Sequence, residues 1–419
     1  MSIAIFGYGV VGSGVAGVIA RCADEVEKRS GVRLEVRTIV DVRDFPEDDP
    51  YAHLIVSDAD TVFSDPSIDI VVETIGGTGV AYDFTKRAML AGKNVVTSNK
   101  ELVATHGPEL LRLAADNRVR YRYEASVGGG IPIIRPLHND LAANRILSIA
   151  GIVNGTTNYI LTRMEQDGVG FQEALSEAQE NGYAEQDPTA DVDGLDAGRK
   201  LAIMASIVLH EHVPPENIHT VGIRDVSPED SRLAAALGGN LKLIASMRRY
   251  DDDRVALIVA PHFVANDQPL AGTHGVFNAV QVTGDSVGDT MFYGQGAGTW
   301  PTASAVVADV IELATLPYTT VDAETWPEAS PGRLISHKDA PVRAIVRFKS
   351  GADRRAEIVS ELAELRPEIV ELAGDDLVLR VGDQNEVAGA PTDDVVTEGR
   401  LVEALREWTP ETVSILRVL

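Results

Sequence analysis

Three glycines close to the N-terminus constrain the fold more than any other feature of the sequence. Gly7, Gly9 and Gly12 are spaced as Gly-x-Gly-x-x-Gly, directly after an apolar run at residues 2–6 and before a helical pattern. Such glycines permit a tight turn, a close approach of the backbone to a pyrophosphate and close packing of the helix. The N-terminus of that helix then faces the phosphates. The pattern therefore predicts a dinucleotide-binding unit.

The first third of the chain alternates between predicted strands and predicted helices. Further strands are predicted at residues 32–41, 68–73, 94–98 and 119–124, and helices at residues 82–91 and 109–117. Because such alternation favours parallel strands with helices on both faces, this part predicts a Rossmann-type doubly wound parallel sheet in an α/β fold. We assign residues 1–131 to this dinucleotide-binding domain and expect residues 300–318 to complete it.

The remainder of the chain predicts an α+β domain, a linker and a small C-terminal module. Residues 132–299 mix strand patterns with helical patterns, as an α+β domain does. Prolines and charged residues are frequent in residues 319–339, which is typical of a linker. Residues 340–419 follow the order strand, helix, strand, strand, helix, strand. This βαββαβ order predicts a ferredoxin-like fold.

The composition excludes several classes of protein. The net charge is −26, so a nucleic acid would be repelled and no nucleic-acid partner is expected. Cys22 is the single cysteine, which rules out an intrachain disulfide and a cysteine metal cluster. The sequence offers neither a membrane-spanning apolar stretch nor a signal peptide, so we expect a cytoplasmic protein without a membrane partner. The dispersed acidity suits a high-salt cytoplasm, and an ordinary acidic cytosolic enzyme is the alternative.

Charged residues after two of the predicted strands are candidates for contacts to the cofactor. Asp41 closes the second strand, where a carboxylate would accept a ribose hydroxyl, and Arg43 beside it could hold the 2′-phosphate of NADP. The pair favours NADP slightly over NAD. Lys100 follows the strand at residues 94–98, on the edge where ligands bind in such sheets. Its ammonium could polarise a carbonyl group or relay a proton, and a solvated surface lysine is the alternative.

Two loops that follow predicted strands are candidates for ligand contacts. Glu124 begins a loop with three consecutive glycines before Pro132. Carbonyl oxygens and a carboxylate there could bind an alkali or alkaline-earth ion, and a tight turn into the next domain is an equal alternative. The sequence Asn-Gly-Thr-Thr-Asn at residues 154–158 could bind substrate or the nicotinamide amide, or could cap the following helix.

A dense group of charged residues surrounds the start of a predicted helix at residues 194–209. Asp196 and Lys200 are four residues apart in this helix, so their side chains share a face. The helix continues into an apolar run that must be buried, and a lysine that enters a buried helix beside carboxylates is a candidate general acid or base. The alternatives are a surface salt bridge and a metal site that includes Asp191 and Asp193.

Several of these segments together resemble the homoserine dehydrogenase family. The similar segments are Gly-Tyr-Gly-Val-Val-Gly at 7–12, Thr-Ser-Asn-Lys at 97–100, Glu-Ala-Ser-Val-Gly-Gly-Gly-Ile-Pro at 124–132, Gly-Ile-Val-Asn-Gly-Thr-Thr-Asn-Tyr-Ile-Leu at 151–161, the block at 182–200, and Gly-Gln-Gly-Ala-Gly at 294–298. They occur in order over roughly the first three quarters of the chain, so the resemblance is specific. The C-terminal part matches the family in its pattern of elements alone.

The resemblance implies roles for individual residues. It implies that Lys200 and Lys100 are catalytic residues, with Lys200 as proton donor and acceptor at the hydroxyl group. It implies that the amino acid contacts Gly182, Glu185 and Asp196. The expected cofactor-binding residues are Gly7, Gly9, Val10, Val11, Gly12, Asp41, Arg43, Thr74, Lys100 and Gly296. The expected ligands of a monovalent cation such as Na⁺ are Glu124, Val127, Gly129 and Ile131.

The resemblance also implies a reaction and an assembly. The family interconverts L-aspartate 4-semialdehyde and L-homoserine with NAD or NADP, in threonine and methionine biosynthesis. Residues 132–299 would be the catalytic and dimerisation domain of a homodimer, and residues 340–419 an ACT-like regulatory module. Two alternatives stay open, namely a dehydrogenase that acts on a carbon–nitrogen bond of an amino acid and a non-catalytic sensor of nucleotides or amino acids.

Overall fold

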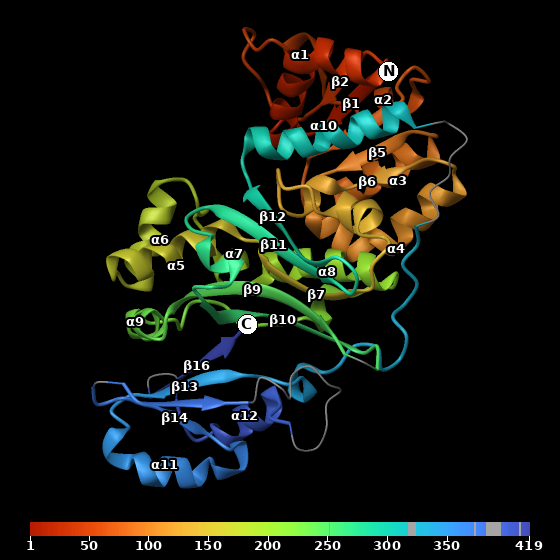
Figure 1. Ribbon diagram of the computed structural model, residues 1–419. Coiled ribbons are helices and arrows are strands. Elements are labelled where there is room, and N and C mark those ends of the chain that lie inside the picture. The colour runs from red at the N-terminus through yellow and green to blue at the C-terminus, as the bar shows by residue number, and fades with distance from the viewer. Residues whose placement is uncertain (251, 317–323, 373, 383–394, 410–411) are drawn as a thin grey trace. The chain divides into compact units, whose positions relative to one another are not determined.

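The computed structural model describes every residue of the chain except 251, 317–323, 373, 383–394 and 410–411 (Figure 1). The described residues form two compact units. The first unit contains residues 1–143, 202–215 and 292–329, and the second contains residues 144–201, 216–291 and 330–419. The predicted linker at residues 319–339 lies partly outside the described residues. The domain boundaries expected from the sequence stay a prediction.

The first unit is built on a six-stranded parallel sheet. Its strands are β1 (Ser2–Phe6), β2 (Glu35–Val40), β3 (Ile55–Val56), β4 (Ile70–Glu73), β5 (Asn94–Thr97) and β6 (Tyr121–Arg122). They lie in the order β3-β2-β1-β4-β5-β6, and every neighbouring pair is parallel. The predicted doubly wound sheet is therefore confirmed. Its strand order reverses between β1 and β4, and such sheets bind dinucleotides outside the carboxyl ends of the strands at that point.

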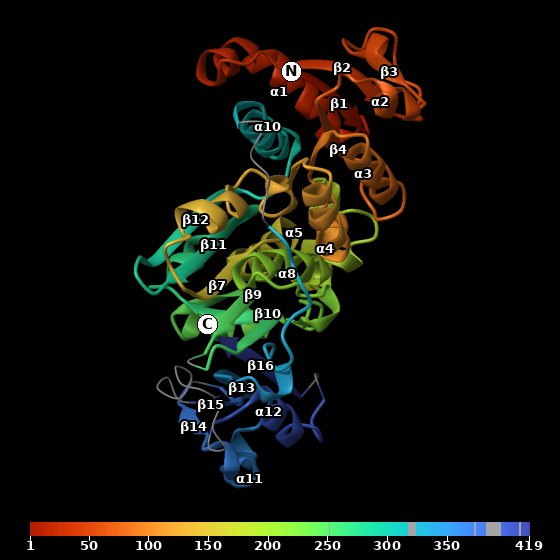
Figure 2. The same cartoon turned by 90° about the vertical axis from the view of Figure 1, so that its right-hand side faces the viewer.

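Five helices accompany the described part of this sheet. They are α1 (Val10–Ser30), α2 (Asp60–Ser64), α3 (Val80–Leu90), α4 (Lys100–Asp116) and α10 (Thr299–Thr315). α10 comes from a distant part of the chain and packs on α1 (Figure 1, Figure 2). Val15 and Ile19 of α1 share one buried cluster with Val306 and Val310 of α10. Residues near 300 thus complete the core beneath the glycine-rich turn.

Helix α4 is longer than the sequence predicted. The expected helix began at residue 109, after Pro108, whereas α4 begins at Lys100 and contains Pro108. A proline inside a helix has no N–H to donate, which leaves the carbonyl four residues earlier without its usual partner. Here the ring nitrogen Nε2 of His212 lies 3.1 Å from that carbonyl oxygen, on Ala104. A distant side chain thus replaces the missing hydrogen bond, so the helix continues through the proline.

The second unit is built on a mixed sheet. Its strands are β7 (Ile146–Ile152), β8 (His219–Thr220), β9 (Gly239–Arg249), β10 (Val255–Ala265), β11 (Phe277–Gly284), β12 (Gly288–Gln295), β13 (Ala344–Phe348), β14 (Glu368–Val370), β15 (Leu377–Val381) and β16 (Val413–Val418). Its helices are α5 (Gly155–Asp167), α6 (Phe171–Glu180), α7 (Thr189–Val192), α8 (Leu195–Leu209), α9 (Pro228–Ala236), α11 (Arg355–Glu361) and α12 (Glu398–Ala404). β12 and α8 each contribute residues to both units.

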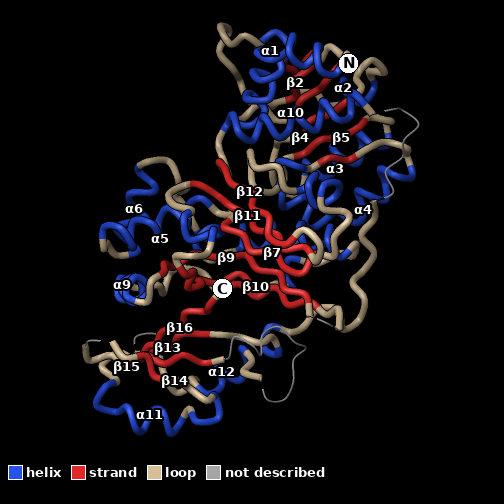
Figure 3. The backbone as a smooth tube through the Cα atoms, viewed as in Figure 1, coloured by secondary structure: helices blue, strands red, loops and turns tan. Residues whose placement is uncertain are grey.

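The last strand joins two parts of this sheet. The order along the sheet is β12-β11-β7-β9-β10-β16-β13-β15-β14, with β8 beside β10. β16 lies between β10 and β13 (Figure 3). It runs antiparallel to β13 and parallel to β10, where His262 pairs with Arg417. The C-terminal elements are therefore continuous with the central strands in one hydrogen-bonded sheet.

No helix within the described ranges is both long and apolar enough to cross a membrane.

Candidate active site

The glycine-rich turn between β1 and α1 leaves space for a phosphate group. Gly7 has a φ of +89°, and a Cβ at Gly12 would overlap the carbonyl oxygen of Gly7. The hydroxyl of Thr74 donates to the Gly7 oxygen at 2.8 Å, which holds the turn against β4. A Cβ at Gly9 would have the Arg43 guanidinium, 3.8 Å away, as its nearest neighbour within the described residues. The turn thus fits a pyrophosphate at the N-terminus of α1.

Apolar side chains are exposed to water around this turn. Val10, the first residue of α1, is 67% exposed, and Val42 after β2 is 86% exposed. Ile75 and Val80, which follow β4, are also exposed. β2, β1 and β4 are neighbours in the sheet, so these side chains belong to loops at one edge. Exposed apolar groups at that edge suit the flat rings of a dinucleotide.

Asp41 and Arg43 form a tight ion pair beside the turn. Arg43 donates to the Asp41 carboxylate from Nε at 3.0 Å and from Nη2 at 2.7 Å. The backbone N–H of Tyr8 donates to the same carboxylate at 2.7 Å. The hydrogen bonds from Arg43 hold the pKa of Asp41 well below its usual range. The Asp41 oxygens are thus already in use, whereas the Arg43 side chain is 58% exposed.

Lys100 is held at the first position of α4 by the residue before it. Asn99 caps this helix, because its side-chain oxygen accepts from Leu102 N at 3.0 Å. The Asn99 amide also donates to the carbonyl oxygen of Gly77 at 2.6 Å, in the loop after β4. The loops that follow β4 and β5 are thereby joined beside Lys100.

Glu73 lies at the end of β4 and is wholly buried. Its carboxylate accepts hydrogen bonds from the hydroxyl of Thr97 at 2.5 Å and from Ile75 N at 2.7 Å. Burial raises the pKa of Glu73. Sequence reasoning missed this residue, although a carboxylate that ends a wholly apolar strand at the carboxyl edge of a parallel sheet was the available signal.

The glycine loop after β6 packs against the segment around Gly296. Gly129 has a φ of +55°, and a Cβ there would overlap the carbonyl oxygen of Gly296. The side chain of Glu124 accepts three backbone N–H groups, from Ile133, Ile134 and Arg135, at 2.6 to 2.9 Å. The carboxylate thus anchors the chain after the loop. Gly296 itself lies against the expected cation loop.

Lys200 is buried on the inner face of α8, and 8% of it is exposed. Its ammonium donates to Val153 O at 2.6 Å and to Asp196 Oδ2 at 2.7 Å. The expected pair of side chains on one helical face is therefore present. The amide of Asn154 donates to the same Asp196 oxygen at 2.9 Å and to Asp191 at 2.7 Å. This links the end of β7 to the start of α8.

The loop after α6 carries the other predicted substrate residues. Gly182 has a φ of +73°, and Glu185 has an exposed side chain. The hydroxyl of Thr156, at the start of α5, donates to the carbonyl oxygen of Tyr183 at 2.6 Å. The Asn-Gly-Thr-Thr-Asn segment thus contacts both this loop and the carboxylates near Lys200. Sequence reasoning had left the role of that segment open.

The predicted site residues divide between the two compact units. Lys100 and the residues expected to bind cofactor and cation belong to the first unit, whereas Gly182, Glu185, Asp196 and Lys200 belong to the second. The assembly of both halves into one catalytic site remains a prediction.

Two models of one protein family match consecutive segments of the chain, up to residue 311. Residues 7–124 match the model described as the NAD binding domain of homoserine dehydrogenase, and residues 132–311 match the homoserine dehydrogenase model. The homoserine dehydrogenase of Pseudomonas aeruginosa is 43% identical over 313 residues, which are 75% of this chain and 72% of that protein. The chain belongs to the homoserine dehydrogenase family.

Solved structures agree with this assignment. The structure of a homoserine dehydrogenase from Thiobacillus denitrificans is 33% identical, with a TM-score of 0.87, and covers 100% of this chain and 98% of that one. A hyperthermophilic archaeal homoserine dehydrogenase in complex with NADPH is 30% identical, with a TM-score of 0.64, and covers 75% of this chain and 98% of that one.

The activity expected from the sequence is thereby confirmed. The chain is an NAD(P)-dependent oxidoreductase that acts on a CH–OH group and interconverts L-aspartate 4-semialdehyde and L-homoserine. This reaction fits threonine and methionine biosynthesis. The matched relatives named above are homoserine dehydrogenases, which disfavours the two alternative functions considered from the sequence.

Proposed function

We propose that Lys200 protonates the substrate oxygen when the aldehyde is reduced and takes the proton back when homoserine is oxidised. The observation that supports this is the buried Lys200 ammonium, which bridges Val153 O and Asp196. A lysine ammonium can give its proton to a substrate oxygen and take it back, whereas an arginine guanidinium stays protonated. Asp196 acts by orienting the ammonium, and Asn154 holds Asp196 in place.

The other residues of the proposed site bind the substrate and position it for the reaction with the cofactor. The nicotinamide, when bound, supplies the hydride for the aldehyde carbon. Glu185 and Asp196 provide negative charge for the substrate ammonium, and the backbone of Gly182 contacts the amino acid. Lys100 stands at the N-terminus of α4 and polarises the carbonyl oxygen. Holding the aldehyde against the hydride donor supplies much of the rate enhancement through orientation.

The direct test is turnover by the purified protein. Homoserine-dependent reduction of NADP and of NAD is followed by absorbance, at low salt and at molar salt. We expect turnover with homoserine and none with aspartate as the substrate. Folded protein that reduces neither cofactor under any of these conditions would overturn the proposal.

We further propose that NADP is the preferred cofactor. The support is the arrangement of Asp41 and Arg43: the carboxylate is occupied by its neighbours, while an exposed guanidinium lies beside Gly9. An exposed arginine in this position suits the 2′-phosphate of NADP, because a guanidinium binds a phosphate with two parallel hydrogen bonds. An aspartate that is free to accept would have favoured the ribose hydroxyls of NAD.

Replacing Arg43 should affect the KM for NADP and the KM for NAD differently. Arg43→Gln is expected to raise the KM for NADP roughly tenfold or more, because a charge-assisted hydrogen bond to the phosphate is lost. The KM for NAD should change little. Steady-state kinetics with both cofactors provide the measurement, and Arg37→Gln, which removes an exposed arginine of β2, is the matched control. Equal losses for NADP and NAD would contradict the NADP preference.

The loop from Glu124 to Ile131 is proposed to bind a monovalent cation such as Na⁺. The proposed ligands are carbonyl oxygens at Glu124, Val127, Gly129 and Ile131, because the Glu124 carboxylate is engaged by backbone N–H groups. Among the described residues, no group of three His, Cys, Asp or Glu side chains is arranged for a metal ion. A site built from carbonyl oxygens suits a hard alkali ion better than a transition metal.

The C-terminal elements are proposed to form an ACT-like module. β13, α11, β14, β15, α12 and β16 follow the βαββαβ order, and their strands lie in the order β16-β13-β15-β14. This arrangement supports a ferredoxin-like fold. The module keeps its own buried cluster, which includes Phe348, Ile358 and Leu401.

A homodimer is proposed for the assembly. The support is β12, the edge strand of the large sheet, on which Met291 and Tyr293 are exposed. An exposed edge strand with large apolar side chains is a site at which proteins associate. Sedimentation velocity tests the stoichiometry, and Met291→Lys is expected to weaken the association. A wild-type monomer at micromolar concentration would contradict this proposal.

A further inference from the structure

Glu73 contacts two chain segments at the carboxyl edge of the parallel sheet. Its Oε1 accepts from the backbone N–H groups of Ile75 at 2.7 Å and of Gly76 at 3.3 Å, in the loop after β4. Its Oε2 accepts from the hydroxyl of Thr97 at 2.5 Å, at the end of β5. β4 and β5 are neighbours in the sheet, and their register pairs Glu73 with Thr97. One carboxylate therefore links the loop after β4 to the end of β5.

The hydrogen bond to Thr97 continues toward Lys100. The hydroxyl oxygen of Thr97 accepts from the backbone N–H of Asn99 at 2.9 Å. The Asn99 amide donates to Gly77 O at 2.6 Å, and its side-chain oxygen caps α4. Lys100 is the first residue of this helix. These bonds form a chain that leads from the buried Glu73 to the start of α4.

The loop after β4 borders the place where a dinucleotide would bind. The order of the sheet reverses between β1 and β4, and dinucleotides bind outside the carboxyl ends of the strands at such a point. Ile75 is partly exposed, and a Cβ at Gly76 or Gly77 would meet no described atom within 4 Å beyond its chain neighbours. Glu73 therefore fixes the backbone of a loop with open space on its outer side.

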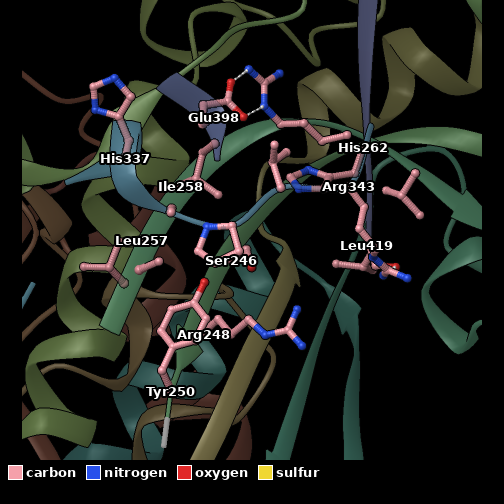
Figure 4. Close-up of a pocket in the computed structure, with 16 residues that line it drawn as sticks. Ser246, Arg248, Tyr250, Leu257, Ile258, His262, His337, Arg343, Glu398 and Leu419 are labelled. Carbon is pink, nitrogen blue, oxygen red and sulfur yellow. Dashed lines mark hydrogen bonds and ion pairs between the residues drawn. The ribbon is translucent and has the colours of Figure 1, made fainter. Parts of the chain in front are cut away.

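Fully buried carboxylates are rare unless a cation pairs with them, and Glu398 at the start of α12 is a paired example. It forms a buried ion pair with Arg417. Figure 4 shows Glu398 at a pocket of about 100 Å³ in the second unit. Among the described residues, by contrast, no lysine, arginine or histidine forms an ion pair with Glu73. Burial of an acid without a cation reduces stability, which indicates that the contacts of Glu73 to the two segments serve the site.

We propose that Glu73 is a positioning residue, which fixes Lys100 relative to the loop that borders the cofactor. The inference rests on the role proposed above for Lys100, which polarises the substrate carbonyl. Glu73 acts through Thr97 on one side and through the N–H groups of the loop on the other. A misplacement of about 1 Å in a reacting group can lower a rate roughly 100-fold, so a rigid link between the two segments supports turnover.

Two variants separate the two sides of this link. Glu73→Leu removes the bonds to both segments, whereas Thr97→Val removes the bond that leads to α4 and leaves the loop bonds of Glu73 in place. We expect Glu73→Leu to lower kcat roughly 10- to 100-fold and to raise the Kd for NADPH about three- to tenfold. Thr97→Val should lower kcat roughly tenfold and keep the Kd for NADPH within about twofold. Steady-state kinetics and fluorescence titration measure these quantities, with rates normalised to folded protein.

A double-mutant cycle with Lys100→Met tests whether the effect passes through Lys100. In that background Thr97→Val should change kcat by less than about twofold, because no ammonium is left to position. Losses that multiply in the double variant overturn the inference and leave the role of Lys100 intact. A Lys100→Met enzyme with the wild-type kcat refutes the role of Lys100 itself and the inference with it. The two failures are therefore distinguishable.

Glu398→Gln is the matched control, because it removes the charge of another buried carboxylate from the C-terminal elements. It should lower Tm through the loss of its ion pair with Arg417, and should leave kcat and the Kd for NADPH unchanged. An equal loss of kcat in Glu398→Gln and Thr97→Val overturns the inference, as does a folded Glu73→Leu protein with the wild-type kcat and Kd. If Glu73→Leu does not fold, Thr97→Val decides the question alone.

Discussion

Two buried lysines in the second unit have different surroundings. The Lys200 ammonium bonds to the Asp196 carboxylate at 2.7 Å, whereas the Lys242 ammonium bonds to the Thr273 carbonyl oxygen at 2.8 Å. A carboxylate holds and orients the charged form of a lysine, as a proton donor requires. Lys242 has no such carboxylate contact in the described chain, so burial dominates its titration. The two residues therefore make natural controls for each other.

Replacing Lys200 should affect chemistry more than cofactor binding. Lys200→Ala is expected to lower kcat by roughly 10²- to 10⁴-fold, the usual contribution of a general acid or base. The Kd for NADPH, measured by fluorescence titration, should stay within about threefold, a factor worth less than ~1 kcal/mol. Because the variant leaves Asp196 without its lysine, rates are normalised to folded protein. Lys242→Met should retain most of its turnover, and a Lys200→Ala enzyme of comparable rate would exclude Lys200 as the proton donor.

The stability of the chain should depend on pH through Lys242. Burial lowers the pKa of Lys242 from 10.5 to about 8. Between these values the unfolded chain binds the proton and the folded chain does not, so folded stability rises with pH from about 8 to 10.5. Below pH 8 the buried charge carries its full penalty. Lys242→Met should therefore stabilise the protein at pH 7, by up to about 3 kcal/mol.

Urea unfolding at pH 7 and pH 10 provides this measurement. The advantage of Lys242→Met over the wild type should be large at pH 7 and small at pH 10. His274, 3.5 Å from the ammonium, does not disturb the comparison, because its pKa is lowered from 6.5 and so lies below this window. The carbonyl oxygen of Thr273 keeps a second donor, the amide of Asn158, in the variant. A difference in stability between Lys242→Met and the wild type that is the same at both pH values would contradict the lowered pKa of Lys242.

The candidate site was visible in the sequence to the extent that it depends on local spacing. The glycine turn and the pairing of Asp196 with Lys200 follow from three residues in a fixed pattern and from one helical turn. The distant hydrogen-bond partners of Asn154 and Glu73 were not visible, because they lie more than 20 positions away in the chain. No local pattern marks such contacts.

At the scale of elements, helix α4 connects the parallel sheet to Lys100. Asn99→Ala removes the cap of this helix and the bond to Gly77, and should destabilise the protein by about 1 kcal/mol. It should also lower kcat/KM roughly tenfold, because Lys100 is the first residue of the helix and a small misplacement of a reacting group is costly. Thermal unfolding and steady-state kinetics measure the two effects.

The opposite end of the same helix provides the control. Asn117 follows α4, and its amide donates to Leu113 O at 2.8 Å. Asn117→Ala is expected to reduce stability modestly while leaving kcat/KM unchanged, because it lies away from Lys100. Equal losses of activity in both variants would mean that general stability, rather than the position of Lys100, determines the rate.

Element boundaries followed local signals except where tertiary contacts override them. β1 and β5 were expected close to their observed positions, but β9 and β12 were not anticipated. β9 contains a lysine and two arginines, which obscured its apolar alternation, and the structure buries or pairs most of these charges. α4 passes through Pro108 because His212 supplies the missing donor, and a contact over 108 positions cannot be read from a local window.

At the scale of the whole molecule, the net charge of −26 should make stability depend on salt. Like charges on the surface repel one another, and the Debye length falls from about 30 Å at 0.01 M salt to about 3 Å at 1 M. We therefore expect the free energy of unfolding to increase between 0.05 M and 1 M KCl. Urea, which is uncharged, is the suitable denaturant, and an unchanged or lower stability at 1 M KCl would show that self-repulsion is unimportant.

The parallel sheet of the first unit and the βαββαβ order of the described C-terminal elements were accessible from the order of elements in the sequence. The joining of the C-terminal elements to the central strands was not, because β16 is short and its partner β10 lies some 150 positions earlier in the chain. The sequence pattern says which face of a strand is apolar, but not which distant strand it will pair with.

Helix α10 has a consequence for how the protein is made. The apolar face of α1 is covered by Val306 and Val310, which leave the ribosome long after α1 does. The strands of the first sheet are therefore synthesised before α10, so the apolar face of α1 is uncovered while the strands of the second unit emerge from the ribosome. A nascent chain that stalls before Thr299 would present this face to chaperones and proteases. The nucleotide-binding core is therefore completed only after α10, which ends at Thr315 of the 419 residues, has been synthesised.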